Sequence, residues 1–193
     1  IAIRSAFNLL KLLPRARDYI VQMKYKPKPK YQRGLIWHSV GAGNSSLVGQ
    51  MLPQPVVESV NHCSCLLDSV LPDGPVLLLL SRTPDRDMPA QIQQQFEAIG
   101  VAIIGLTPED INPLTKSFEV FRDQSLGLAL PPYKNYVGFA LIIRRDRYIA
   151  ALRPVTELIH LIEICQILSL GQNPSPKPRA TSSDYRAGHC TAV

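Results

Sequence analysis

Apolar residues in the middle of the chain follow two patterns, which together predict strands that alternate with helices. Residues 76–80 and 101–106 are continuous apolar runs bounded by turn-forming residues, and such runs are typical of strands buried on both faces of a sheet. Between them, apolar residues recur at helical spacing over 89–100. Because glycine favours the end of a helix, Gly100 is the predicted stop.

A second helix and a strand hairpin are predicted to follow. Helical spacing of apolar residues indicates a helix over 113–124. Two apolar runs, 139–143 and 148–152, then flank the charged residues Arg-Asp-Arg at 145–147. Runs of this kind on either side of a short polar turn predict an antiparallel pair of strands. The pair is so apolar that other elements must cover it.

The pattern over 155–169 predicts a helix that closes the domain. Seven apolar residues fall on one broad arc of this helix: Val155, Leu158, Ile159, Leu161, Ile162, Cys165 and Leu168. Ile164 and Ile167 lie outside this arc, on the polar side. We therefore expect these two isoleucines to be exposed and to meet either a partner surface or the missing domain.

The order of these elements predicts the fold class: α/β, a thioredoxin-like β-α-β-α-β-β-α domain with an N-terminal helical and extended segment. A thioredoxin oxidoreductase needs a cysteine where the first strand leads into the first helix, because a helix N-terminus lowers the pKa of the attacking thiol. Residues 81–89 occupy that place and contain no cysteine. Thiol-disulfide chemistry is therefore not expected.

Clusters of proline mark the limits of the predicted domains. Residues 1–60 are predicted to be the C-terminal end of a missing flavin or substrate domain together with an extended linker. This part contains two short helices within 3–25 and a basic strap of alternating lysine and proline at 24–31. The thioredoxin-like domain is predicted to span 61–170, and 171–193 is predicted to be a disordered tail.

Charge and cysteine usage exclude several classes of function. The net charge of +6 comes from scattered basic residues that form no nucleic-acid-binding signature, so no nucleic acid partner is expected. No apolar run reaches the roughly 20 residues that span a bilayer, so no membrane partner is expected either. The four cysteines, Cys63, Cys65, Cys165 and Cys190, lack zinc-ligand spacing. They are predicted to be free thiols in a reducing, cytoplasmic setting.

Other residue types that often carry chemistry offer no site here. The glycine-rich stretch 41–46 lacks the Gly-Lys-Ser/Thr ending of a phosphate-binding loop. Glu157 and Glu163 are predicted to lie on a solvated helix face, where neither is a convincing acid or base. The histidines stand apart from other metal-ligand residues: His38, His62, His160 and His189. We therefore predict no catalytic, cofactor-binding or metal-binding residues in this chain.

Several short motifs between residues 10 and 152 have a common likeness. They include MKYKPKPKY at 23–31, VGQMLPQP at 48–55 and RRDRYIAA at 144–151. Together they resemble the C-terminal region of FAD-dependent aromatic-ring monooxygenases, and the closest likeness is to the 3-(3-hydroxyphenyl)propionate hydroxylase group. The most specific motif is Arg-x-Asp-x-Tyr-x-Ala in the second hairpin strand. Members of that family usually have proline after the first arginine, whereas this chain has Arg145.

The resemblance implies a parent flavoprotein that hydroxylates a phenolic ring with FAD and NAD(P)H. No glycine-rich dinucleotide fingerprint occurs in this chain, so the fragment is expected to lack the active site, to bind no cofactor and to be inactive alone. Its expected role is structural, as an interface to the upstream flavin domain of the same polypeptide, with self-association as a homo-oligomer. The alternative is a free-standing interaction module without redox activity, acting through Ile164, Ile167 and the basic strap.

Overall fold

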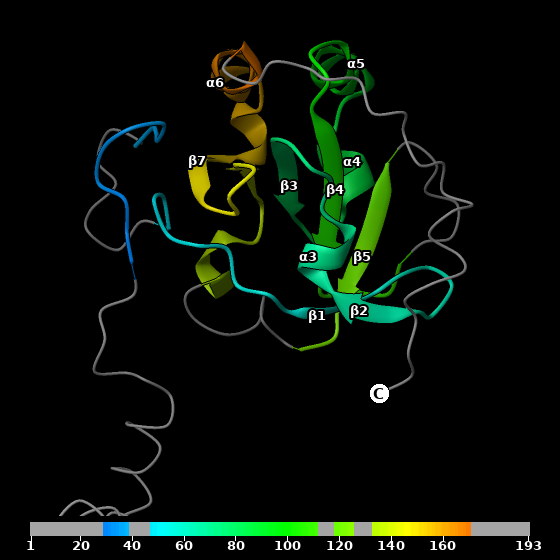
Figure 1. The fold of residues 1–193 in the computed structure, drawn as a ribbon. Coiled ribbons are helices and arrows are strands. Elements are labelled where there is room, and N and C mark those ends of the chain that lie inside the picture. Colours follow the sequence, from blue (N-terminus) through cyan, green and yellow to red (C-terminus); the bar gives the residue numbers. More distant parts are fainter. Residues whose placement is uncertain (1–28, 39–46, 112–117, 126–132, 171–193) are drawn as a thin grey trace, which may run out of the picture. The chain divides into compact units, whose positions relative to one another are not determined.

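The computed structural model describes residues 29–38, 47–111, 118–125 and 133–170 (Figure 1). The chain divides into two compact units, Ile1–Lys30 and Tyr31–Val193, and the elements below belong to the second. The predictions for the helices within 3–25, the stretch 41–46 and the tail 171–193 lie outside the described residues, as does most of the basic strap. The compact unit begins at Tyr31, and the assignment of 1–60 to the end of a missing domain stays a prediction.

The described residues form a mixed sheet of seven strands with helices packed on it (Figure 1). The strands in chain order are β1 (Val56–Glu58), β2 (Ser64–Leu66), β3 (Val76–Leu80), β4 (Ala102–Thr107), β5 (Glu119–Asp123), β6 (Phe139–Ile143) and β7 (Ile149–Pro154). The helices are α3 (Leu67–Val70), α4 (Pro84–Asp87), α5 (Ala90–Ala98), α6 (Ile159–Leu170) and the 3-10 turns η2 (Tyr133–Tyr136) and η3 (Val155–Glu157). Across the sheet the order is β2-β1-β5-β4-β3-β6-β7.

The central strands have the connectivity that the sequence predicts. β3 and β4 pair in parallel, with α5 between them in the chain. β6 pairs antiparallel with β3, and β7 pairs antiparallel with β6. The resulting order β4-β3-β6-β7, closed by α6, is a β-α-β unit followed by a β-β-α unit, which confirms the thioredoxin-like α/β fold.

The prediction of a helix over 113–124 is wrong for the part of this range that the structure describes. Residues Glu119–Asp123 form β5, which pairs in parallel with β4 and antiparallel with β1. Both Val120 and Phe121 are buried, and helical spacing cannot distinguish such a short apolar run from a strand. Because β4 would otherwise expose unpaired backbone groups at a sheet edge, strand pairing prevails over local helical preference.

The core lies in two layers, one on each face of the sheet. Every residue of β3 is fully buried, and alternate side chains enter opposite layers, since successive side chains of a strand point to opposite faces. Leu77 and Leu79 pack with α5 and α6 through Phe96, Leu161 and Cys165. The other layer contains Leu47, Leu52 and Leu67. Each such side chain stabilises the fold by about 1.5–3 kcal/mol.

The predicted orientation of the last helix needs correction. Ile164 is only 6% exposed and belongs to the core, contrary to the expectation that it faces a partner. Ile167 is 43% exposed, as predicted, whereas Ile159 is 58% exposed although the pattern placed it on the buried arc. The physical reason is a change of helix type, because 155–157 form a 3-10 turn before α6 begins. With three residues per turn instead of 3.6, this first turn shifts the phase of every later side chain.

Candidate functional site

The segment after β3, where a thioredoxin places its cysteine, contains a closed hydrogen-bond network. Ser81 is buried, and its hydroxyl donates to the carboxylate of Asp87. The same oxygen accepts a hydrogen bond from the backbone N–H of Thr83 at 2.9 Å. The thiols of the described residues lie elsewhere, with Cys63 and Cys65 at β2 and Cys165 in α6. This segment therefore fixes the start of α4 and offers no sulfur nucleophile.

The residues after β3 also do not fit FAD. A dinucleotide cradle needs glycines between strand and helix, because only glycine lets the backbone approach the pyrophosphate closely. The turn from β3 to α4 runs Ser81-Arg82-Thr83-Pro84 and contains no glycine. In addition, α4 has four residues, too few to present a long helix dipole to a phosphate. No step of a flavin reaction can be assigned to this part of the chain.

Arg147 ties the β6–β7 turn to the turn before β3. Its guanidinium donates to Asp68 at 2.5 Å and to the backbone carbonyls of Leu71 and Pro72 at 3.1 and 3.0 Å. The backbone N–H of Arg147 also donates to the Arg144 carbonyl at 2.9 Å, which closes the turn. A planar guanidinium suits this set of acceptors because its donors are arranged as a rigid fork. The Arg147 side chain thus acts as a structural clamp between the β6–β7 turn and the residues before β3.

The other charged residues of the turn make more exposed pairs. Arg145, at the position where the family usually has proline, forms a two-pronged bridge to Asp73 at 2.8 and 3.0 Å. Arg144 pairs with Asp146 at 2.7 Å. Arg145 occupies the second position of the four-residue turn, where proline would also fit. The sequence departs from the family pattern here without opening the turn.

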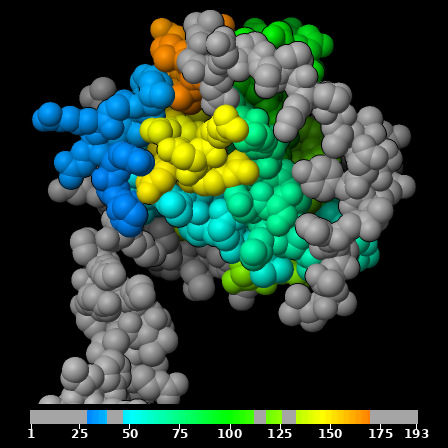
Figure 2. All heavy atoms as spheres, in the orientation of Figure 1, coloured from blue at the N-terminus to red at the C-terminus, as the bar shows by residue number. Residues whose placement is uncertain are grey.

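The outer edge of β7 is covered by an edge segment, which we define as residues 31–38 and 47–52. The backbone N–H of Trp37 donates to the Ala150 carbonyl at 2.7 Å. The Gly49 N–H donates to the Ile149 carbonyl at 2.8 Å, and the Ile149 N–H donates to the Gln50 carbonyl at 2.9 Å. Leu52 N–H donates to the Arg147 carbonyl at 2.8 Å. In Figure 2 the blue residues of the edge segment lie against the yellow hairpin. The edge of β7 is therefore closed to another strand.

Three of the four residues of the Arg-x-Asp-x-Tyr-x-Ala motif contact this junction. Tyr148 packs edge to face against Tyr31 with ring centroids 4.6 Å apart. The guanidinium of Arg144 lies over the Tyr31 ring at 5.4 Å, where a cation is attracted to the aromatic face. Ala150 is fully buried and its carbonyl receives the Trp37 bond. The motif that the sequence singled out thus joins the edge segment to the sheet.

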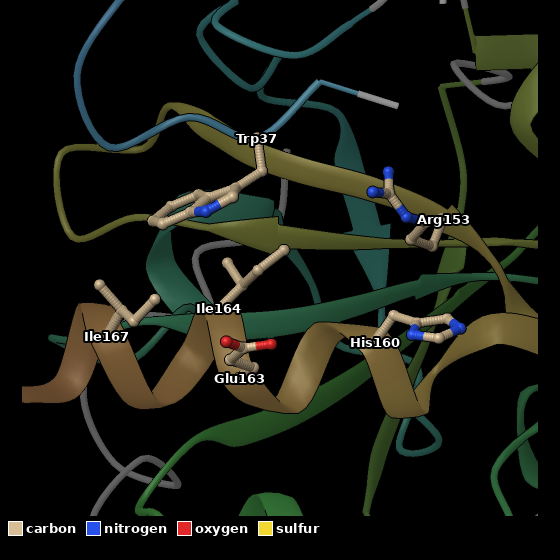
Figure 3. Close-up of a pocket in the computed structure, with 6 residues that line it drawn as sticks. All are labelled: Trp37, Arg153, His160, Glu163, Ile164 and Ile167. Atoms are coloured by element: carbon tan, nitrogen blue, oxygen red, sulfur yellow. The ribbon is translucent and has the colours of Figure 1, made fainter. Parts of the chain in front are cut away.

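A groove lies between the edge segment and α6. It has a volume of about 480 Å³ and is lined by Trp37, Arg153, His160, Glu163, Ile164 and Ile167. In Figure 3 the indole of Trp37 faces Ile164 and Ile167, and Arg153 and His160 lie toward the opposite end. Its walls combine an apolar end with charged groups of both signs. Trp37 carried no signal in the sequence, because only the folded chain brings it opposite α6.

An acidic residue that sequence reasoning missed lies at the junction of β1 and β5. Glu58 is 7% exposed and binds Arg122 of β5. It also accepts a hydrogen bond from His62 at 2.9 Å, and Arg122 reaches Asp110 at 2.7 Å. The hydrogen bond from His62, followed by those from Arg122 and a neighbouring glutamine, lowers the pKa of the Glu58 carboxyl against the opposing effect of burial. This network holds two short strands together.

The histidines of the described region have no metal-like surroundings. His160 lines the groove, His62 binds Glu58, and His38 is exposed, while His189 lies outside the described residues. No group of three or more His, Cys, Asp or Glu side chains that could hold a metal ion occurs in the described part of the chain. Every helix in that part is also too short or too polar to traverse a bilayer. Glu157 lies 3.9 Å from Arg153, and Glu163 lies on the groove wall.

Comparison with known sequences decides the family. The HcaD C-terminal domain pattern matches residues 49–166, which is more than half of the chain. This chain belongs to the HcaD C-terminal domain family. The matched region begins in the edge segment and ends in α6, so it includes Arg153, His160, Glu163 and Ile164 of the groove but not Trp37 or Ile167.

The curated relatives of this HcaD C-terminal domain are hydroxylases by name. A 3-(3-hydroxy-phenyl)propionate/3-hydroxycinnamic acid hydroxylase of Klebsiella pneumoniae is 31% identical over 163 residues, which cover 78% of this chain and 28% of the relative. A hydroxylase of the same name from Mycolicibacterium smegmatis is 26% identical, with 72% of this chain and 25% of the relative covered. These relatives confirm the resemblance found in the sequence. The chain spans about a quarter of their length.

Solved structures of two kinds are similar to this chain. The flavin-dependent monooxygenase PieE in complex with FAD and substrate has a TM-score of 0.48 at 16% identity, with 74% of this chain and 25% of that chain covered. Peroxidoxin BcpB from Mycobacterium tuberculosis has a TM-score of 0.47 at 12% identity, with 66% of this chain and 98% of that chain covered. The fold assignment itself rests on the strand order and connectivity described above.

Proposed function

We propose that this chain is the C-terminal structural module of an FAD-dependent aromatic hydroxylase and that it is inactive alone. The observation that carries the proposal is the family match over 49–166, in relatives of which the chain spans only about a quarter. The motif shared with the hydroxylases supports a structural role, because its residues make packing and backbone contacts at the β7 edge. The aromatic ring, the FAD and the NAD(P)H would bind in the upstream part of the polypeptide.

The proposal includes a partner and a compartment. The partner is the flavin domain that precedes this module in the same polypeptide, and residues 1–60 would include the end of that domain. The intact protein would work in the cytoplasm, where free thiols stay reduced, and its self-association stays a prediction. The alternative of a free-standing interaction module is weaker, because Ile164, one of its two proposed contact residues, is buried in the core.

The test compares the 193-residue chain with the longer polypeptide that contains it. We expect the longer protein to purify with bound FAD and to oxidise NADH or NADPH faster when 3-(3-hydroxyphenyl)propionate is added. The 193-residue chain is expected to show neither flavin absorbance nor oxidation. Flavin binding by the 193-residue chain would contradict the assignment of the site to the upstream part. A longer polypeptide that folds without flavin would overturn the proposal as a whole.

A further inference from the structure

We propose that the groove between Trp37 and α6 receives an apolar side chain from the domain that precedes this module in the intact polypeptide. The inference rests on the proposed function, since it assumes that such a domain is present. It goes further by naming the surface of this module that the domain contacts and the chemistry of the contact.

The groove has a floor and walls suited to one apolar anchor. Ile164 is buried and forms the floor, while Ile167 remains substantially exposed at the rim. The half-buried indole of Trp37 faces both isoleucines across the groove (Figure 3). A leucine, isoleucine, methionine or phenylalanine inserted there would contact apolar surface on both sides, and burial of that surface is favourable.

The charged residues of the groove indicate which side chains of the partner surface should lie beside the apolar anchor. Arg153 and His160 lie toward the other end of the groove, and Glu163 projects from α6 between the two ends (Figure 3). Arg153 already lies 3.9 Å from Glu157, so the charge that the partner surface should supply is a basic side chain near Glu163. Such a mixture of apolar centre and charged rim is typical of contacts between domains of one chain, which are more polar than permanent subunit interfaces.

The length of the relatives identifies the occupant. The chain covers 28% of the Klebsiella relative, and its family is a C-terminal domain, so most of the relative's length precedes the matched region. Trp37 belongs to the edge segment, with which the compact unit begins. The preceding polypeptide therefore connects to this unit a few residues before Trp37 in the sequence.

Covalent connection also explains why so small a groove suffices. A separate protein partner would need an interface of about 1,000 Å² or more. A domain joined through a short linker has an effective concentration of about millimolar, so a single anchor with a few flanking charges gives substantial occupancy. A preceding domain fits the observed groove better than an independent protein does.

The experiment measures amide hydrogen exchange of α6 and of residues 31–38 in two proteins, the 193-residue chain and the longer polypeptide. We expect exchange in both segments to be about tenfold or more slower in the longer polypeptide, because docking restricts their local opening. Ile167→Glu in the longer polypeptide should abolish this protection. Ile159→Glu is the matched control, since Ile159 is exposed on the same helix but does not line the groove.

Each alternative gives a distinct outcome. Equal exchange in the two proteins, or protection that persists in Ile167→Glu, would overturn the proposal. Protection in the 193-residue chain that grows with its concentration would identify a second copy as the occupant and would also overturn it. Because both isoleucines are exposed, we expect both variants to unfold at the same denaturant concentration as the parent. Flavin content is measured in parallel, so a longer polypeptide that binds FAD but leaves α6 unprotected refutes only the docking surface.

Discussion

The ring of Tyr31 packs edge to face against the ring of Tyr148, with centroids 4.6 Å apart, and so fastens the edge segment to the β6–β7 hairpin. Aromatic pairs in this geometry contribute about 0.5–1.5 kcal/mol beyond their burial. Backbone bonds from Tyr31 to Gly49 and from Trp37 to Ala150 reinforce the contact. The edge segment is therefore an integral part of the folded unit.

Gly49 allows the closest approach within the edge segment. Its φ is +82°, and a Cβ at this position would overlap the carbonyl oxygen of Tyr31. We expect Gly49→Ala to lower the free energy of unfolding by about 2–4 kcal/mol, since it adds a backbone clash to the strain of a positive φ. Gly34→Ala is the control, because Gly34 also has a positive φ but has open space around it. It should cost about 1 kcal/mol, and equal costs in urea unfolding would contradict the role of close approach.

Arg147 should matter more to stability than Arg145, although both form ion pairs in the same turn. The Arg147 side chain is 22% exposed and also bonds two backbone carbonyls, whereas Arg145 is 64% exposed. We expect Arg147→Lys to cost about 1–2 kcal/mol, because lysine keeps the charge but loses the fork. Arg145→Lys should cost under about 1 kcal/mol. Both values can be measured by guanidinium unfolding, and the reverse order would refute the clamp.

The Glu58 network predicts a dependence of stability on pH. The pKa of Glu58 is lowered in the folded protein from its ordinary value of 4.5, chiefly by the hydrogen bond from His62. A lowered folded pKa stabilises the protein fully above pH 4.5, and this stabilisation is lost as the pH falls through the folded pKa. Thermal unfolding should show Glu58→Gln to be less stable than the parent at pH 7. The difference in stability should shrink as the pH falls below 4.5.

Asp110→Asn is the matched control for that pH experiment. Asp110 also binds Arg122, but its side chain is 92% exposed, so solvent screens the interaction. We expect this variant to follow the pH profile of the parent. If Glu58→Gln keeps a constant difference from the parent between pH 7 and pH 3, the carboxylate does not provide the linkage.

Cys165 should resist alkylation as long as the protein is folded. Burial in the layer beneath α6 raises its pKa to about 12, so little of the reactive thiolate is present at pH 8. Cys63 and Cys65 are partly exposed at β2, and we expect iodoacetamide to modify them first. Peptide mass spectrometry can follow each site, with a denatured sample as the control in which Cys165 also reacts. Rapid native labelling of Cys165 would contradict its burial.

The strands and helices predicted correctly are those whose signal is local. β3, β4, β6 and β7 appear in the sequence as apolar runs of five or more residues, and α5 as a clear helical repeat. β1 and β2 have three residues each, which is too short for any period to be visible. The apolar pattern of β5 fits a helix as well as a strand. It forms a strand because the backbone of β4 is available for pairing on that side.

The same division holds for the candidate site. The sequence singled out the Arg-x-Asp-x-Tyr-x-Ala motif, but it could not indicate that Arg147 reaches Asp68 or that Tyr148 meets Tyr31. Nor could it place Trp37 opposite Ile164, because the 3-10 turn before α6 sets the phase of the helix.

By itself, the sequence determined the order of the core elements, the absence of a cysteine after β3 and the likeness to the hydroxylases. These follow from the order and spacing of residue types. Hydrophobic burial depends on such patterns and does not require a particular orientation between the groups in contact. Only the tertiary structure decided which distant groups meet, including the clamp of Arg147, the closed edge of β7 and the groove beside α6. Hydrogen bonds and ring contacts are directional, so they exist only once strand register and helix phase are fixed.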